Sequence, residues 1–342
     1  MTSSQPLESE SSPEKICQTG PDARVVAPEI LRTCWFLVGP TASGKTAAAL
    51  LLAQQFSVPA EIIALDSMTV YRGMDIGTAK PTIAEQAVVP HHLLDVCHPW
   101  ESFSTAEYLQ CVAWAVADIV SRGRTPFFVG GTGLYLHALL RGLCDAPAAD
   151  WELRRTLQAE CDALGQVALH QRLAAVDPLT AARLPAADVR RVIRALEVFQ
   201  LTGQPLSAQQ QERALPEDER PQHLYWLCPP RAELCTRINQ RVDEMLAAGF
   251  VSEVQRLRDD PRGVSHSAAQ ALGYREIGMH LEGRCSLNAA AEEIRLRTRQ
   301  FAKRQQTWFR KLFECRAIEL AGGESAAAIA ARILTTATQN SP

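Results

Sequence analysis

The segment 39–46 constrains the fold of this chain more than any other. It reads Gly-Pro-Thr-Ala-Ser-Gly-Lys-Thr and matches the phosphate-binding loop pattern GxxxxGK[ST]. The pattern is meaningful only between a strand and a helix. The apolar run Cys34–Val38 predicts a buried strand before the loop, and the Ala- and Leu-rich segment 46–56 predicts a helix after it. This context indicates an α/β fold of the P-loop NTPase type.

Further segments extend this α/β pattern. Residues 61–65, 126–129 and 224–228 are short apolar runs that predict buried strands. Residues 105–122 predict a helix, with Thr105 as its cap. Because strands alternate with helices, we expect a parallel sheet flanked by helices.

The helical patterns indicate how the chain divides into domains. Segments 231–258 and 286–313 read as long helices, and 150–212 is helical with few β-branched runs. We predict a disordered extension, a discontinuous P-loop core with C-terminal basic helices, a helical insertion domain, and a C-terminal tail. The extension spans residues 1–30, and the core spans 31–145 and 222–320. The insertion spans 146–221, and the tail spans 321–342.

Composition excludes several classes of protein. A net charge of −3 over 342 residues argues against a generally basic nucleic-acid binder, although a local basic face is compatible with it. None of the 10 cysteines forms a CxxC pair, so a zinc ribbon is not expected. Single, scattered cysteines are instead typical of a cytoplasmic protein in which they stay reduced. No apolar window is long enough to span a bilayer, so no membrane partner is expected.

The loop predicts a polyphosphate ligand. Its backbone N–H groups and the start of the following helix would surround the phosphates. Lys45 would add a positive charge, and Thr46 would offer its hydroxyl to Mg²⁺, the expected cofactor. The predicted phosphate-binding residues are Gly39, Pro40, Thr41, Ala42, Ser43, Gly44, Lys45 and Thr46. A kinase, an ATP-binding NTPase and a diphosphate-releasing transferase would all use such a loop.

Asp66 directly follows the predicted strand 61–65, at the carboxyl edge where open α/β sheets bind ligands. A carboxylate there can hold Mg²⁺ through water or accept a proton from a nucleophile. From position alone, a surface aspartate that caps the next turn near Ser67 is an equal alternative.

Several further motifs resemble one family. They are Asp66–Pro81, His91–Val96, Gly130–Tyr135, Gly273–Arg275 and Thr298–Gln305. With the phosphate loop, they resemble the tRNA dimethylallyltransferases, or tRNA isopentenyltransferases, in their bacterial form, over about residues 33–315. Many members have Gln where this chain has Thr69, and the zinc finger common in eukaryotic members is absent.

The resemblance implies transfer of a dimethylallyl group from dimethylallyl diphosphate to N6 of the adenosine 3′ of the anticodon, in tRNAs that read codons starting with U. Diphosphate is released, and the phosphate loop holds this leaving group. The expected partners are the tRNA anticodon stem-loop and dimethylallyl diphosphate, and the enzyme is expected to be a monomer. The adenine must be extruded into a pocket, as in other base-modifying enzymes.

The same resemblance implies roles for individual residues. Asp66 would be the general base, and Thr46 and Arg241 would complete the catalytic group. Arg237 and Arg241 share a helix face, and either could hold the diphosphate or simply pair with nearby carboxylates. The predicted tRNA-binding residues are Asp66, Ser67, Met68, Thr69, Thr132, Arg154, Arg190, Arg191, Val192, Ile193, Arg194, Gln270, Ala271, Leu272, Gly273, Tyr274 and Arg275.

Residues 290–316 form a candidate RNA-binding helix, since eight basic and three acidic side chains give it a charge of +5. Its aromatic side chains Phe301, Trp308 and Phe309 are spaced as a core-facing set, which favours packing over base stacking. The pair His91 and His92 favours a packing role over a metal site.

Two other functions fit parts of this pattern. A P-loop ATP-dependent small-molecule kinase would need a nucleotide site and no RNA. A non-catalytic P-loop RNA-binding module would tolerate loss of Asp66.

Overall fold

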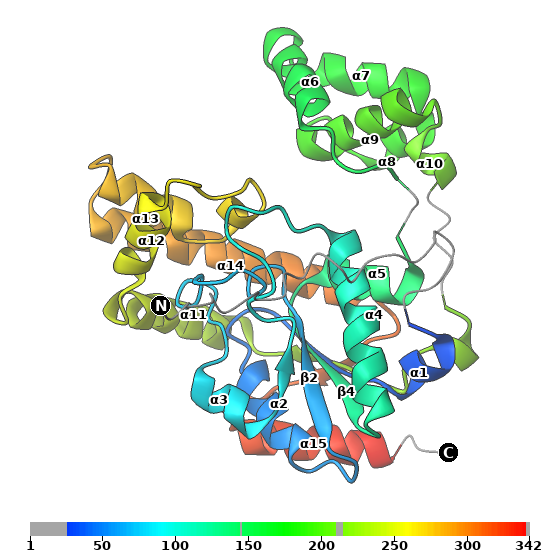
Figure 1. Ribbon diagram of the computed structural model, residues 1–342, viewed down its shortest axis with the longest axis vertical. Helices are drawn as coiled ribbons and strands as arrows, with labels where there is room; N and C mark the ends of the chain where they lie inside the picture. Colours follow the sequence, from blue (N-terminus) through cyan, green and yellow to red (C-terminus); the bar gives the residue numbers. More distant parts are fainter. Residues whose placement is uncertain (1–25, 144–145, 210–214, 340–342) are drawn as a thin grey trace, which may run out of the picture.

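The computed structural model describes residues 26–143, 146–209 and 215–339. These residues form a six-stranded, entirely parallel sheet in the order β3-β2-β4-β1-β5-β6 (Figure 1). The strands are Trp35–Val38 (β1), Ala60–Leu65 (β2), His91–His92 (β3), Thr125–Gly130 (β4), His223–Cys228 (β5) and Arg316–Glu319 (β6). The predicted parallel α/β fold is confirmed.

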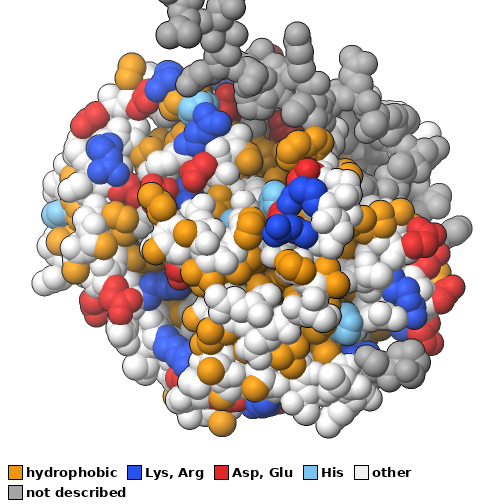
Figure 2. All heavy atoms as spheres, turned by 60° about the horizontal axis from the view of Figure 1, so that its bottom comes forward, with side chains coloured by type: hydrophobic (Ala, Val, Ile, Leu, Met, Phe, Trp, Pro, Cys, Tyr) orange, Lys and Arg blue, Asp and Glu red, His pale blue; other side chains and the backbone are white. Residues whose placement is uncertain are grey.

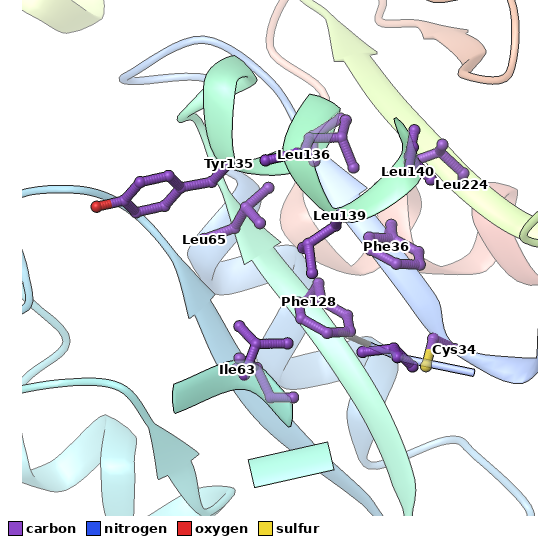
Figure 3. Close-up of a cluster of buried hydrophobic side chains, with 14 of the residues drawn as sticks. Cys34, Phe36, Ile63, Leu65, Phe128, Tyr135, Leu136, Leu139, Leu140 and Leu224 are labelled. Carbon is purple, nitrogen blue, oxygen red and sulfur yellow. The ribbon is translucent and has the colours of Figure 1, made fainter. Parts of the chain in front are cut away.

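The central strands are apolar on both faces because helices cover both sides of the sheet. Phe36 packs with Phe128 on one face, and their rings stack at 4.6 Å. Leu37, the next residue of β1, joins the cluster on the opposite face. Figure 3 shows the first of these clusters, in which Leu136 and Leu139 of helix α5 (Gly133–Arg141) cover the strands.

Helix α4 (Thr105–Ser121) lies beside α5 on that face. The cap of α4 differs from the expected one. Ser104, not Thr105, accepts the hydrogen bond from Glu107 N, while the Glu107 carboxylate accepts from Ser104 N. This reciprocal pair is a capping box, so Ser104 is the N-cap and Thr105 is the first residue of the helix.

Helices α2 (Lys45–Ala53) and α15 (Ala326–Thr338) cover the other face of the sheet. The expectation that 321–342 is a tail is wrong for α15. Ile329 and Ile333 are buried against the α2 side of the core. Their four-residue spacing places both on one face of the helix, which gives α15 an apolar stripe to bury.

The C-terminal half adds four helices beside the carboxyl edge of the sheet: α11 (Arg231–Ala247), α12 (Phe250–Asp259), α13 (Tyr274–Leu281) and α14 (Leu287–Lys311). The single helix predicted over 231–258 is broken, because Gly249 has φ 99° and ends α11. Glycine adopts this left-handed conformation at little cost.

Helices α6 to α10 form a separate cluster with its own apolar core (Figure 1). Their bounds are Trp151–Leu164, Gln166–Val176, Pro178–Arg183, Val189–Thr202 and Leu206–Gln209. These helices fall within the predicted insertion, hereafter the insertion. It meets the rest of the molecule where Trp151 packs on His266 and where Arg190 Nη1 donates to Gln270 Oε1 at 3.1 Å.

Short elements complete the chain: α1 (Pro28–Thr33), α3 (Ile83–Val88), η2 (Glu217–Glu219) and η3 (Ala268–Gln270). The expected disordered extension lies outside the described residues up to residue 25. Its last residues are helical instead, because Leu31 of α1 is buried in the core.

Figure 2 turns the lower end of the molecule forward, the end that carries α15 in Figure 1. Basic, acidic and apolar side chains are interspersed over this face. It therefore lacks the one-signed charge that favours contact with RNA.

Candidate active site

Three loops meet at the carboxyl edge of the sheet. The phosphate loop follows β1, Asp66 follows β2, and the Gly131–Thr132 loop follows β4. Strand β4 lies between β1 and β2, so the three loops are neighbours. The topology thus brings together the residues that the sequence identified separately.

The phosphate loop has the backbone that its pattern predicts. Ala42 and Gly44 have φ of 62° and 84°, and Gly44 precedes the first turn of α2. Lys45 Nζ donates to Pro40 O at 3.2 Å, so the lysine folds back over its own loop. Thr46 follows Lys45 in the first turn of α2. Helix dipole, lysine and loop therefore present positive charge at one place.

The two arginines on α11 both lie beside the phosphate loop. Arg241 Nη1 donates to Thr41 Oγ1 at 3.2 Å and interacts electrostatically with both Lys45 and Asp66. Arg237 pairs with Glu233 at 2.5 Å, and its Nη1 would lie 3.3 Å from a methyl group at Gly44 of the phosphate loop. Arg237 thus has the predicted carboxylate partner, and both arginines lie where they could hold a diphosphate.

The ionisable groups of the site have shifted pKa values. Burial, with help from the nearby Arg241 charge, lowers the pKa of Lys45 to about 8, against a raising effect from Asp66. Burial also raises the pKa of Asp66, opposed by the hydrogen bond from Met68 N (2.9 Å) and by the Lys45 and Arg241 charges. A carboxylate with a raised pKa is a better proton acceptor, as general-base catalysis requires.

Thr132 is tied to the loop that bears Asp66. Its Oγ1 accepts from Ser67 N at 3.0 Å, and its side chain makes no capping hydrogen bond to α5. Gly131 N and Thr132 N both donate to Leu65 O at 3.1 Å. Thr132 therefore positions the segment after β2 more than it caps the helix.

Sequence reasoning missed three buried polar residues beside the site. Glu253 accepts from the backbone N–H groups of Asp75, Ile76 and Gly77, and Lys80 pairs with Asp75 and Asp95. Gln305 of α14 contacts both the phosphate loop and the Gly131 loop. Gln305 lay in a quoted motif, and the apolar spacing of Ile294, Ala302 and Phe309 around it signals a core position.

The predicted tRNA-binding residues fall into three groups. Arg190, Arg191, Gln270 and Arg275 are exposed. Arg154 and Arg194 are paired with the buried carboxylate of Glu197. The remaining residues are buried or partly buried at these positions: Asp66, Ser67, Met68, Thr69, Thr132, Val192, Ile193, Ala271, Leu272, Gly273 and Tyr274. The side chains of Val192 and Ile193 pack inside the insertion.

Helix α14 has one face toward the core and one toward solvent. Phe309 is fully buried, and Trp308 packs on Gly133 and His137, as the packing interpretation predicts. Lys303 and Arg304 are exposed. His92 Nε2 bonds Glu61 Oε2 at 2.7 Å, beside the sheet.

The comparisons with known proteins agree with this geometry. The family model described as "IPP transferase" matches residues 69–312, and that described as "Isopentenyl transferase" matches residues 32–100.

The chain belongs to the IPP transferase family. It is 49% identical to "tRNA dimethylallyltransferase 1" of Trichlorobacter lovleyi, over 80% of this chain and 89% of the relative. It is 47% identical to "tRNA dimethylallyltransferase" of Roseiflexus sp., over 81% and 89%.

Solved IPP transferase structures share the fold. A tRNA isopentenylpyrophosphate transferase from Bacillus halodurans superposes with a TM-score of 0.63 at 36% identity, over 90% of this chain and 98% of that chain. A eukaryotic dimethylallyltransferase acting on tRNA gives 0.72 at 26% identity, over 90% and 80%. These relatives support a transferase and not the small-molecule kinase. Within the part of the chain that the structure describes, no helix is long and apolar enough to cross a bilayer.

Proposed function

We propose that this protein is a tRNA dimethylallyltransferase that transfers a dimethylallyl group from dimethylallyl diphosphate to N6 of the adenosine 3′ of the anticodon. The observation that carries the proposal is the juxtaposition of a phosphate loop with Asp66 on neighbouring strand ends. One loop can hold a diphosphate leaving group while the adjacent carboxylate faces the incoming amine.

The donor half of the site would bind diphosphate. Lys45 and Arg241 supply positive charge, and the start of α2 supplies backbone N–H groups. The buried Ser43 hydroxyl has no hydrogen-bond partner among the described residues. A buried hydroxyl without a protein partner fits a site whose missing partner is a ligand oxygen.

Mg²⁺ fits the donor set at this edge. The Thr46 hydroxyl is an oxygen ligand, the kind that Mg²⁺ prefers, and Asp66 could hold the ion through a water molecule while its carboxylate stays available for a proton. With only these protein groups, the remaining positions would belong to diphosphate and water. The ion would neutralise charge on the departing diphosphate.

In the acceptor half, N6 of the adenosine forms a bond to the first carbon of the dimethylallyl group as the bond from that carbon to the diphosphate oxygen breaks. The proton leaves N6 for the carboxylate of Asp66, and the diphosphate leaves with the bonding electron pair. Arg190, Arg191, Gln270 and Arg275, all exposed, are available to the anticodon stem-loop. The unpaired cysteines described, such as Cys34 and Cys97, agree with a cytoplasmic enzyme, and its action as a monomer stays a prediction.

The test is mass spectrometry of nucleosides from an unmodified anticodon stem-loop incubated with protein, Mg²⁺ and dimethylallyl diphosphate. We expect a dimethylallyl adduct on the adenosine 3′ of the anticodon, with the rate at least about 10²-fold lower in Asp66→Asn. The matched control is Asp259→Asn, an exposed aspartate on α12. Absence of an adduct, with ATP consumed instead, would return the chain to the kinase function.

A further inference from the structure

Gln305 is a buried amide at the centre of the site that none of the proposed chemical steps uses. It lies on α14, and only 7% of its surface is exposed. Its Oε1 accepts from Thr41 N at 2.9 Å, and its Nε2 donates to Gly131 O at 2.8 Å. One side chain therefore joins the phosphate loop to the loop after β4.

The bond to Thr41 has a consequence for the phosphate loop. The Thr41 N–H is engaged by Gln305, so it is not one of the loop donors that face a ligand. The Thr41 hydroxyl accepts from Arg241 at the same time. Thr41 is thus fixed through its backbone by α14 and through its side chain by α11.

The bond to Gly131 reaches the acceptor half. Gly131 precedes Thr132, whose hydroxyl accepts from Ser67 N, and Ser67 follows Asp66. Interactions therefore run without interruption from Arg241 through Thr41, Gln305 and the Gly131 loop to the segment of the proposed base.

Packing at both ends shows that Gln305 has little freedom. A methyl group at Gly131 would lie 2.4 Å from Gln305 Nε2, so this close approach requires glycine. About one turn earlier on α14, Ala302 shares a small apolar cluster with Ala42 of the phosphate loop. The same helix carries Lys303 and Arg304 on its exposed side.

We infer that Gln305 is a positioning residue that sets the phosphate loop and the Thr132 loop relative to each other, and so aligns the diphosphate donor with the base. This inference rests on the proposed function. It assigns Gln305 no contact with RNA, because the side chain is buried beneath the exposed face of α14.

The test uses Gln305→Met, which keeps the side-chain length and removes both hydrogen bonds, with Gln255→Met on the exposed side of α12 as its control. We expect kcat to fall about 10- to 100-fold, as for small misplacements of reacting groups. We also expect the Kd for inorganic diphosphate, measured by calorimetry, to rise at least about threefold. The Kd for the anticodon stem-loop should change less than twofold.

A purely structural role would give a different result. It would lower the melting temperature and the folded fraction while kcat per folded enzyme and the diphosphate Kd stayed at wild-type values, and that outcome overturns the inference. Equal loss of RNA and diphosphate affinity overturns it too. A wild-type protein without transferase activity would refute the proposed function. The diphosphate Kd of the Gln305 variant would still test the inference, because diphosphate binding needs no turnover.

A second pair of variants tests the inference in case Gln305→Met does not fold. Gly131→Ala should weaken diphosphate binding, because its methyl group would lie 2.4 Å from Gln305 Nε2 and 3.1 Å from Gly39 O of the phosphate loop. In Gln305→Ala the closer of these two contacts is gone and only the one with Gly39 O remains, so adding Gly131→Ala should cost less than it does in the wild type. Losses that add fully in the double variant would show that the two positions act independently and would overturn the inference.

Discussion

Lys45 is the most informative single residue. Its positive charge is needed for the proposed diphosphate binding, and its burial costs free energy of folding. Burial and the Arg241 charge bring its pKa down to about 8 in the free protein. Deprotonation above that pH removes a cation from the proposed diphosphate site. We expect kcat/KM for dimethylallyl diphosphate to fall above pH 8.

Bound diphosphate stabilises the protonated lysine, so this alkaline limb should move to higher pH in kcat. The measurement is a pair of pH profiles at low and saturating diphosphate substrate. Lys45→Arg is the control, because a guanidinium stays charged and its profile should lack the limb. An alkaline limb that persists unchanged in Lys45→Arg would assign it to another group.

The same residue predicts a change in stability. A lowered pKa means that folding disfavours the protonated amine, so the cost is present below pH 8 and is relieved as pH rises from about 8 towards the unfolded-state value near 10.5. We expect Lys45→Met to raise the melting temperature at pH 7 by at least about 2 °C while diphosphate binding is lost. Differential scanning calorimetry checks this. A lower melting temperature at pH 7 would show that the lysine contributes to the folded state.

At the scale of elements, α15 shows how a helix joins the core after the last strand. Ile333 is fully buried against the α2 side of the sheet. Ile333→Ala should lower the free energy of unfolding by about 2–5 kcal/mol, and the exposed Thr335→Ala on the same helix should change it by less than about 0.5 kcal/mol. Urea unfolding measures both. Equal midpoints for the two variants would contradict the packing of α15.

Helix α14 predicts the salt dependence of RNA binding. Lys303 and Arg304 are exposed, whereas Arg299 donates to Asn239 and Arg295 pairs with Glu292. The double variant Lys303→Gln with Arg304→Gln should flatten the slope of log affinity for the anticodon stem-loop against log salt by about 1–2. The slope of Arg295→Gln should stay close to wild type. An unaltered slope in the double variant would place the RNA on another face.

Sequence-based prediction succeeded where a short segment of the chain determines the local structure. The phosphate loop, Asp66 at a strand end and the apolar central strands all follow from short patterns, and the structure places them together. Gly249 breaks the long helix predicted over 231–258, although glycine is a known helix terminator. Gln305 and Glu253 are a different case, because their partners lie 264 and 178 residues away in the chain. Contacts at that separation depend on tertiary packing that local patterns do not encode.

At the scale of the whole molecule, the apolar side chains of the sheet and of the insertion form separate clusters. The clusters on the two sheet faces hold the strand before the phosphate loop and the helix after it, whereas the insertion has its own core around Leu173. The insertion meets the rest through a few contacts, among them Trp151 with His266. Because cooperative units follow such clusters, we expect the insertion to unfold separately from the sheet.

This separation can be tested with reciprocal variants. Leu173 and Leu52 are both fully buried, in the insertion and in the α2 side of the sheet respectively. Leu173→Ala should weaken binding of the anticodon stem-loop, because the exposed Arg190 and Arg191 sit on α9, while calorimetric binding of inorganic diphosphate is retained. Leu52→Ala should weaken diphosphate binding first, because α2 begins at Lys45. If both variants lost both ligands along one common unfolding transition, the insertion and the sheet would be a single cooperative unit, and the two substrates would depend on the same packing.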